Sequence, residues 1–177
     1  MRLALLLALA GICSAASEPL VSVSALKEVE KISDARFQPD ANDPWELLGF
    51  TRGTYLPGYG AVFTFEMNLV NVTPLSPFHT TITKEEVRAV HERKIRKLVL
   101  LKSAMYDLLA QAASSLSTLP ATEKITFQAL LINLSFEDRT GLPRRITMTA
   151  NRQKLLDAVA RHAKPADLAA LIEAQEE

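Results

Sequence analysis

The chain lacks a hydrophobic run long enough to stay in a membrane as a spanning helix. Its apolar stretch Leu3–Ile12 follows a single positive residue, Arg2, and ends in the small residues Ser14-Ala15-Ala16. This order is typical of a secretory signal peptide. We therefore expect residues 1–16 to be removed and the mature chain to be exported to the periplasm or the extracellular space. A retained N-terminal anchor is the alternative interpretation.

Cysteine is almost absent, since Cys13 is the only one and lies inside the predicted signal peptide. The mature chain would then have no thiol, which excludes disulfides, thiolate nucleophiles and cysteine-ligated metals. A lipoprotein needs cysteine as its first mature residue after a small residue, whereas Ile12 precedes this cysteine. We expect the stability of the protein to come from an ordinary hydrophobic core.

An excess of one charge is also missing, because 20 lysines and arginines stand against 20 aspartates and glutamates. This balance argues against nucleic acid as the partner and leaves only a peripheral membrane contact open. Hydrophobic residues make up 48% of the chain and charged residues 23%, which is the composition of a globular protein. Residues 17–177 have the size of a single domain.

Hydrophobic periodicity predicts an α+β domain with no internal repeat. The expected elements are a helix over 22–38, a β-hairpin over 46–70, a long helix over 84–116, a second hairpin over 122–150 and C-terminal helices over 151–175. Two hairpins with segregated helices predict a two-layer sandwich. In this sandwich an antiparallel sheet packs against the long helix and the shorter helices.

Capping signals mark the expected helix starts. Ser22 or Ser24 is the candidate N-cap of the first helix. The segment 83–86, TKEE, is typical of a capping box. Asn151 or Thr149 is the candidate cap of the helix that follows the second hairpin.

The two hairpins differ in how well the pattern defines them. Residues 61–69 alternate regularly, and a three-residue loop, 58–60, would place Arg52 opposite Glu66. In the second hairpin the apolar face changes parity within residues 124–136. This change predicts either a bulge near Ala129 or a strand that is covered on both faces.

Motifs for metal and phosphate chemistry are missing. The histidines His79, His91 and His162 are far apart, and Ile95 stands where a zincin helix needs its second histidine. The clustered glycines lie within a hairpin and lead into no helix, so they do not form a phosphate-binding loop. We therefore expect neither a metal nor a cofactor.

One catalytic pattern is present. Ser24 and Lys27 match S-x-x-K, and residues 139–141, RTG, are similar to the K-T-G motif of penicillin-recognising enzymes. A desolvated lysine could activate the serine. However, no middle S-x-N motif and no G-x-S-x-G elbow occur, so Ser24 fits a helix cap better. A small serine-type envelope hydrolase that uses Ser24 and Lys27 is the first alternative function.

Surface features favour binding over catalysis. Residues 91–97, HERKIRK, form a basic run that either binds an anionic surface or presents a solvated helix face. At the tip of the first hairpin, Tyr59 is the aromatic candidate for a binding edge, and Tyr55 is expected to face the core. The preferred prediction is a non-enzymatic exported envelope protein that binds another envelope protein or itself.

The first hairpin also carries a resemblance. Its sequence, TRGTYLPGYGAVFTFEMNLV, contains the pattern Y-L-x-G-Y-G-A-x-F. Over about twenty residues it resembles a hairpin of uncharacterised exported bacterial proteins. The resemblance implies export and a bacterial source, and it carries no activity, cofactor or functional residue to this chain.

Overall fold

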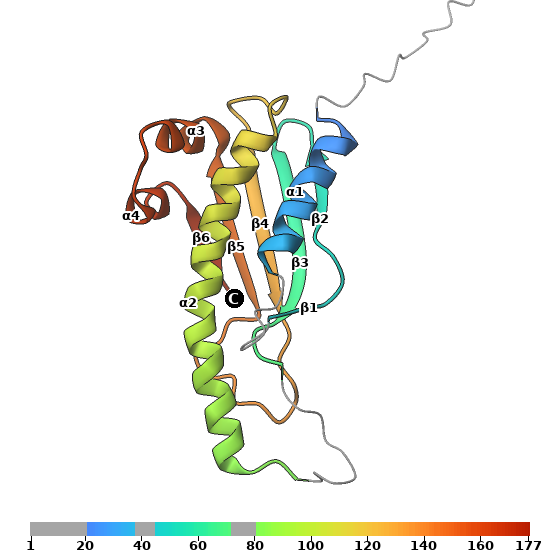
Figure 1. Ribbon diagram of the computed structural model, residues 1–177, viewed down its shortest axis with the longest axis vertical. Coiled ribbons are helices and arrows are strands. Elements are labelled where there is room, and N and C mark those ends of the chain that lie inside the picture. Colours follow the sequence, from blue (N-terminus) through green and yellow to red (C-terminus); the bar gives the residue numbers. More distant parts are fainter. Residues whose placement is uncertain (1–20, 38–44, 72–80) are drawn as a thin grey trace, which may run out of the picture.

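A computed structural model describes residues 21–37, 45–71 and 81–177. It confirms the α+β class, with one layer formed by an open sheet of six strands and the other by helices (Figure 1). The predicted signal peptide, residues 1–16, lies outside the described residues. None of the described helices is long and apolar enough to cross a membrane.

The helices and strands can now be given their observed bounds. In chain order they are α1 (Val23–Arg36), β1 (Glu46–Leu47), β2 (Arg52–Leu56), β3 (Gly60–Asn68), α2 (Lys84–Ser115), β4 (Lys124–Leu131), β5 (Arg145–Asn151), α3 (Arg152–Ala160), α4 (Pro165–Ala169) and β6 (Glu173–Glu176). The long helix and both hairpins therefore lie where the hydrophobic periodicity predicted them.

The helices begin at the predicted caps. The Ser22 hydroxyl accepts a backbone N–H of α1 at 3.2 Å. Thr83 and Glu86 form a capping box, in which the Thr83 N–H donates to the Glu86 carboxylate at 2.7 Å. Asn151 rather than Thr149 caps α3. Each such cap satisfies a backbone donor and is worth about 1 kcal/mol.

The sheet is mixed, whereas the two hairpins alone predicted antiparallel pairing. Strand order is β1-β3-β4-β5-β6, and β2 lies beside β1 along the same edge of β3. β3 and β4 are parallel, and every other pair is antiparallel. β3 and β4 are parallel because the 32-residue helix α2 connects them, and this helix is about 48 Å long. It returns the chain to the end of the sheet where β3 began, as a parallel crossover requires.

The turn of the first hairpin lies one residue earlier than predicted. The loop is 57–59, so Arg52 pairs with Thr64 and not with Glu66. Pro57 is followed by Gly58 at φ +80°, and a 3.0 Å hydrogen bond closes the four-residue turn. A proline followed by a residue of positive φ is the signature of a type II turn. This local preference decided the register.

Strand β4 runs without the predicted bulge. Ala129 pairs regularly with Phe65 on one side and with Ile146 on the other. The side chains that face the helices keep one parity through the strand and are Ile125, Phe127, Ala129 and Leu131. Leu130 consequently lies on the opposite face, where it is half-buried.

The C-terminal segment is not helical throughout, as the prediction for 151–175 had assumed. After α3 and α4 the chain forms the edge strand β6 against β5. Its sequence, EAQE, has little intrinsic β propensity, so pairing with β5 decides its conformation. Ion pairs add to that pairing. The three pairs are Lys102–Glu176 at 2.6 Å, Lys124–Glu173 at 4.0 Å and Arg145–Glu177.

Helix α1 covers the outer edge of β2. The Asp34 carboxylate accepts the Thr51 N–H at 2.8 Å, and the Glu30 carboxylate accepts the Gly53 N–H at 2.8 Å. The Thr51 hydroxyl also donates to Ser33 at 2.9 Å. These backbone donors point away from β3, so α1 supplies acceptors that a neighbouring strand would otherwise provide.

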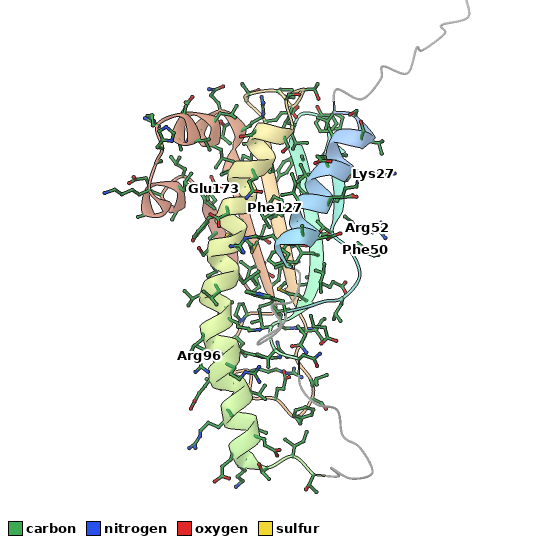
Figure 2. The ribbon with its side chains drawn as sticks, in the orientation of Figure 1. Lys27, Phe50, Arg52, Arg96, Phe127 and Glu173 are labelled. Atoms are coloured by element: carbon green, nitrogen blue, oxygen red, sulfur yellow. The ribbon has the colours of Figure 1, made fainter. Side chains whose placement is uncertain are left out.

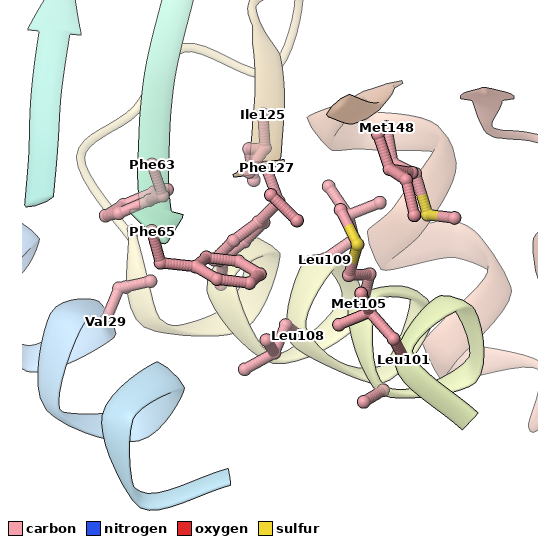
Figure 3. Packing of buried hydrophobic residues seen from close by; sticks show 14 of the residues in the cluster. Val29, Phe63, Phe65, Leu101, Met105, Leu108, Leu109, Ile125, Phe127 and Met148 are labelled. Atoms are coloured by element: carbon pink, nitrogen blue, oxygen red, sulfur yellow. The ribbon is translucent and has the colours of Figure 1, made fainter. Parts of the chain in front are cut away.

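The core lies between the sheet and the helices α1 and α2 (Figure 3). Phe63 and Phe127 stack across the parallel strand pair with ring centroids 4.9 Å apart. Figure 3 shows Leu101, Met105 and Leu108 of α2 beneath them. All of these side chains are at most 1% exposed. The core therefore covers one face of the sheet and leaves the other face without a covering helix.

Candidate binding face of the sheet

The structure separates the S-x-x-K pair from the third element of the catalytic pattern, the RTG segment. Ser24 and Lys27 are both exposed on α1, and the Ser24 hydroxyl lies 2.9 Å from the Ser22 hydroxyl at the N-cap. Figure 2 shows Lys27 on the upper part of α1, whereas the β4–β5 loop with Arg139 lies at the lower end of the sheet (Figure 1). The S-x-x-K pattern thus forms part of a helix start.

The described histidines serve local structure. His91 is half-buried, and its Nδ1 lies 3.1 Å from the backbone oxygen of Asp138. His162 is exposed after α3, and His79 lies outside the described residues. Within the described ranges, no group of three histidine, cysteine or acidic residues could hold a metal ion.

The two lysines of the basic run of α2 are buried, whereas Arg96 is exposed, so neither predicted role of the run holds for Lys94 and Lys97. The Lys94 and Glu137 side chains form an ion pair, and each is 1% exposed. The Lys94 ammonium also donates to Asn133 at 3.0 Å. Lys97 is buried as well, with its ammonium 5.3 Å from the Trp45 ring centroid. Helical spacing could have indicated this, because Lys94, Lys97, Leu98 and Leu101 share the core-facing side of α2.

The face of the sheet directed away from α1 and α2 is the candidate site, and we name it the outer face. No described helix packs over it (Figure 1). Thr126 and Thr149 are nevertheless only 4% and 9% exposed. Side chains alternate along each strand, so the pairing register divides the outer face into four rows. The row nearest the hairpin turn is Leu56-Gly60-Lys124-Asn151. Below it follow the top row Thr54-Val62-Thr126-Thr149-Glu173, the middle row Arg52-Thr64-Gln128-Thr147-Gln175 and the bottom row Glu66-Leu130-Arg145-Glu177.

The centre of the outer face is uncharged. The top and middle rows contribute six residues from the three central strands, and none is charged: Val62, Thr64, Thr126, Gln128, Thr147 and Thr149. The Thr126 and Thr149 hydroxyls lie 3.0 Å apart, and the Gln128 amide donates to Thr147 at 3.3 Å. Tyr59, predicted to be an exposed anchor, is 41% exposed and reaches Thr126 at 3.1 Å. These bonds hold the polar side chains in fixed positions.

Charged residues surround this centre. Figure 2 shows Arg52 on the side of β2 and Glu173 on the side of β6. Glu66 on β3 is exposed and makes no ion pair within the described residues. Arg145 on β5 is paired with Glu177. The charged side chains therefore lie around the uncharged positions of the top and middle rows.

A hollow of about 500 Å³ lies at the bottom row. Its apolar lining comes from Leu130, Leu131 and Ile132, and Ile132 is 38% exposed. The charged lining consists of Glu66, Arg144, Arg145 and Glu177. The sequence pattern had indicated that Leu130 and Ile132 share one parity. It could not show that these apolar residues lie at one end of an otherwise polar sheet face.

A buried carboxylate anchors the hairpin turn at the opposite end of the sheet. Glu123 accepts the Tyr55 hydroxyl at 3.2 Å and the Gly58 N–H at 3.0 Å through the same oxygen. Its second oxygen is buried and has no hydrogen-bond partner among the described residues. Partial burial of the phenol, together with the adjacent Glu123 carboxylate, raises the pKa of Tyr55 above its ordinary value.

We expect the Tyr55 phenol to ionise at a higher pH than an ordinary tyrosine, because its pKa is raised. Because the folded-state pKa is raised, its contribution to stability is complete below the unfolded pKa and is lost as the pH rises through the folded pKa. An absorbance titration at alkaline pH measures this. Tyr55→Phe should remove the late transition, and Glu123→Gln should shift it to lower pH. If the late transition persists in Tyr55→Phe, it belongs to another tyrosine, and the assignment to Tyr55 is wrong.

The site thus combines an uncharged, hydrogen-bonded centre, a charged rim and one apolar hollow. No protein-family model, curated protein or solved structure matches the chain.

Proposed function

We propose that this chain is an exported, non-enzymatic binding protein that contacts another protein through the outer face. The observation that carries the proposal is the lack of charge at six central positions of a sheet face that no described helix covers, four of which are half-buried and two buried. Solvated sheet faces usually alternate apolar inward residues with charged or strongly polar outward ones. Charge depletion at the centre with charges at the rim is instead a feature of interface cores.

The hydrogen bonds between neighbouring strands support the same role. Because Thr126, Thr149, Gln128 and Thr147 already bond to one another, burying them under a second protein leaves few polar groups without partners. The side chains also lose little rotamer freedom on binding, since the bonds already restrict them. Export from the proposed signal peptide would place the face in the cell envelope or outside the cell.

A position-specific crosslinking experiment tests the proposal. A photoreactive residue at Thr147, in the centre of the outer face, should capture a protein in the native envelope. The same residue at Leu100, which is 58% exposed on α2, serves as the matched control. Captured chains are recovered with antibodies and identified by mass spectrometry.

We expect capture from position 147 and little from position 100. Leu130→Lys should abolish capture from position 147, because the substitution adds a charge to the hollow at the bottom row. Leu100→Lys should leave this capture unchanged. Equal capture from both positions, or none from either, contradicts the proposal.

A further inference from the structure

A cluster of three reactive side chains lies between α2 and the β4–β5 loop and consists of Lys94, Asn133 and Glu137. We propose that Lys94 and Asn133 become joined by a side-chain isopeptide bond, which forms within the folded chain with release of ammonia. Glu137 is the acid–base catalyst of this condensation. An amine nucleophile, an amide and an adjacent carboxylate are the groups that the reaction needs. The inference goes beyond the proposed function and does not depend on it.

The three side chains are held in contact. The Lys94 ammonium donates to the side-chain oxygen of Asn133 at 3.0 Å and forms an ion pair with the Glu137 carboxylate. It also donates to the backbone oxygen of Ile132 at 3.3 Å. The carbon to be attacked, Cγ of Asn133, is bonded to the oxygen that the ammonium already contacts. Groups held together in this way react far faster than the same groups on separate molecules.

Burial favours the reaction over the bare ion pair. The Lys94 and Glu137 side chains are each 1% exposed, and Asn133 is half-buried. Transfer of one proton within the pair turns two buried charges into a neutral amine and a neutral acid. One Glu137 oxygen contacts the lysine, and the other is buried with no hydrogen-bond partner among the described residues. This second oxygen is available to the nitrogen that leaves Asn133.

The condensation balances without a further reactant. The Lys94 ammonium gives one proton to Glu137, and the neutral amine attacks Cγ of Asn133. The new C–N bond forms, and the bond from Cγ to the amide nitrogen breaks. A second proton passes from the attacking nitrogen, through Glu137, to the leaving nitrogen, which takes up the first proton as well and departs as ammonium. Glu137 is then a carboxylate again and accepts the N–H of the new amide, so Lys94 remains its partner in the product.

A tight turn presents both loop residues to the helix. The Glu137 N–H donates to the Leu134 carbonyl at 3.2 Å, and the Leu134 N–H donates to the Glu137 carboxylate at 3.1 Å. This turn holds the carboxylate close to Asn133, the residue before Leu134. His91 of α2 contacts the backbone of the same loop through Nδ1 at 3.1 Å, so a second contact keeps the loop against the helix.

The bond fixes a part of the fold that the sheet does not hold. Figure 1 shows the first half of α2 extending past the ends of the strands, and the contacts above place the β4–β5 loop beside it. Lys94 and Asn133 are 39 residues apart in the chain, and a crosslink stabilises a fold mainly by restricting the unfolded chain. The predicted mature chain has no cysteine, so a disulfide cannot serve this purpose.

Mass spectrometry of the purified mature chain tests the inference. The denatured wild type is expected to weigh about 17 Da less than its sequence requires, because one ammonia is lost. Trypsin should not cleave after Lys94 and should release a branched peptide that joins residues 94–96 to residues 125–139. Cleavage after Lys102, which is partly exposed on the same helix, is the internal control. A full mass with complete cleavage after Lys94 overturns the inference.

The branched peptide distinguishes the crosslink from another loss of ammonia. Attack of the Leu134 backbone nitrogen on the Asn133 side chain also releases ammonia, but it leaves Lys94 free for trypsin. A loss of about 17 Da without the branched peptide therefore overturns the inference. The wild-type peptide map is decisive even where a variant fails to fold.

Two variants assign the roles of the residues. Asn133→Ala removes the amide from a half-buried loop position, and it should have the full mass and normal cleavage after Lys94. Glu137→Gln keeps both reacting residues, and its folded form, verified by circular dichroism, should contain at least about tenfold less crosslinked chain. A branched peptide that persists in Asn133→Ala overturns the bond, and equal yields in the wild type and Glu137→Gln overturn the catalytic role of Glu137.

Discussion

Lys94→Met is expected to reduce the free energy of unfolding by about 3–5 kcal/mol, because it leaves Glu137 as an unpaired buried charge. Both side chains are 1% exposed, and the Glu137 oxygen that binds Lys94 also accepts the Leu134 N–H at 3.1 Å. The other Glu137 oxygen is buried with no hydrogen-bond partner among the described residues. Urea denaturation followed by circular dichroism measures the loss.

Two control variants distinguish the cost of leaving a buried charge unpaired from the cost of removing a lysine. Lys102→Met removes a partly exposed ion pair with Glu176 and should cost less than about 1 kcal/mol. The double variant Lys94→Met/Glu137→Gln should recover much of the stability, since a neutral amide still accepts the Leu134 N–H. A loss below about 1 kcal/mol in Lys94→Met alone contradicts the buried-charge argument.

Gly60→Ala is expected to abolish the folded state at 25 °C, at a cost above about 4 kcal/mol. A β-carbon at this position would lie 1.8 Å from the carbonyl oxygen of Lys124, and Gly60 has φ +138°. Neither backbone can withdraw easily, because Gly60 pairs with Lys124 at the start of the parallel ladder and the Tyr59 carbonyl accepts the Lys124 N–H at 2.8 Å.

Gly58→Ala is the matched control for that substitution. Gly58 also has a positive φ, +80°, but a β-carbon there would meet nothing within 4 Å. Gly58→Ala should lower the free energy of unfolding only by the conformational strain, about 1–2 kcal/mol. Equal melting temperatures for the two variants, measured by circular dichroism, would show that the close approach to Lys124 does not decide the fold.

The long helix and the two hairpins could be predicted because local signals specify them. The capping box at Thr83 and Glu86 defines the start of α2, and regular apolar spacing defines its length. The alternation of β3 likewise assigned its inward and outward residues correctly. Such signals depend on residues close in sequence, which a single chain displays directly.

Features decided by distant contacts could not be predicted. β6 forms because β5 offers an unpaired edge, and its own sequence favours no strand. Helical spacing places Lys94 on the core-facing side of α2, but its partner, Glu137 of the β4–β5 loop, is 43 residues away and could not be identified from the sequence. The outer face required the parallel pairing of β3 with β4, since only that pairing aligns the uncharged residues of the central strands.

The carboxylates of Glu30 and Asp34 limit how this protein can assemble. A sheet with a free edge can add strands from further molecules without end, which is the route to fibrils. Here the backbone N–H groups of Thr51 and Gly53 along the edge of β2 are already bonded to α1, and the opposite edge is the four-residue strand β6, rich in glutamate. Growth of the sheet through either edge is therefore disfavoured.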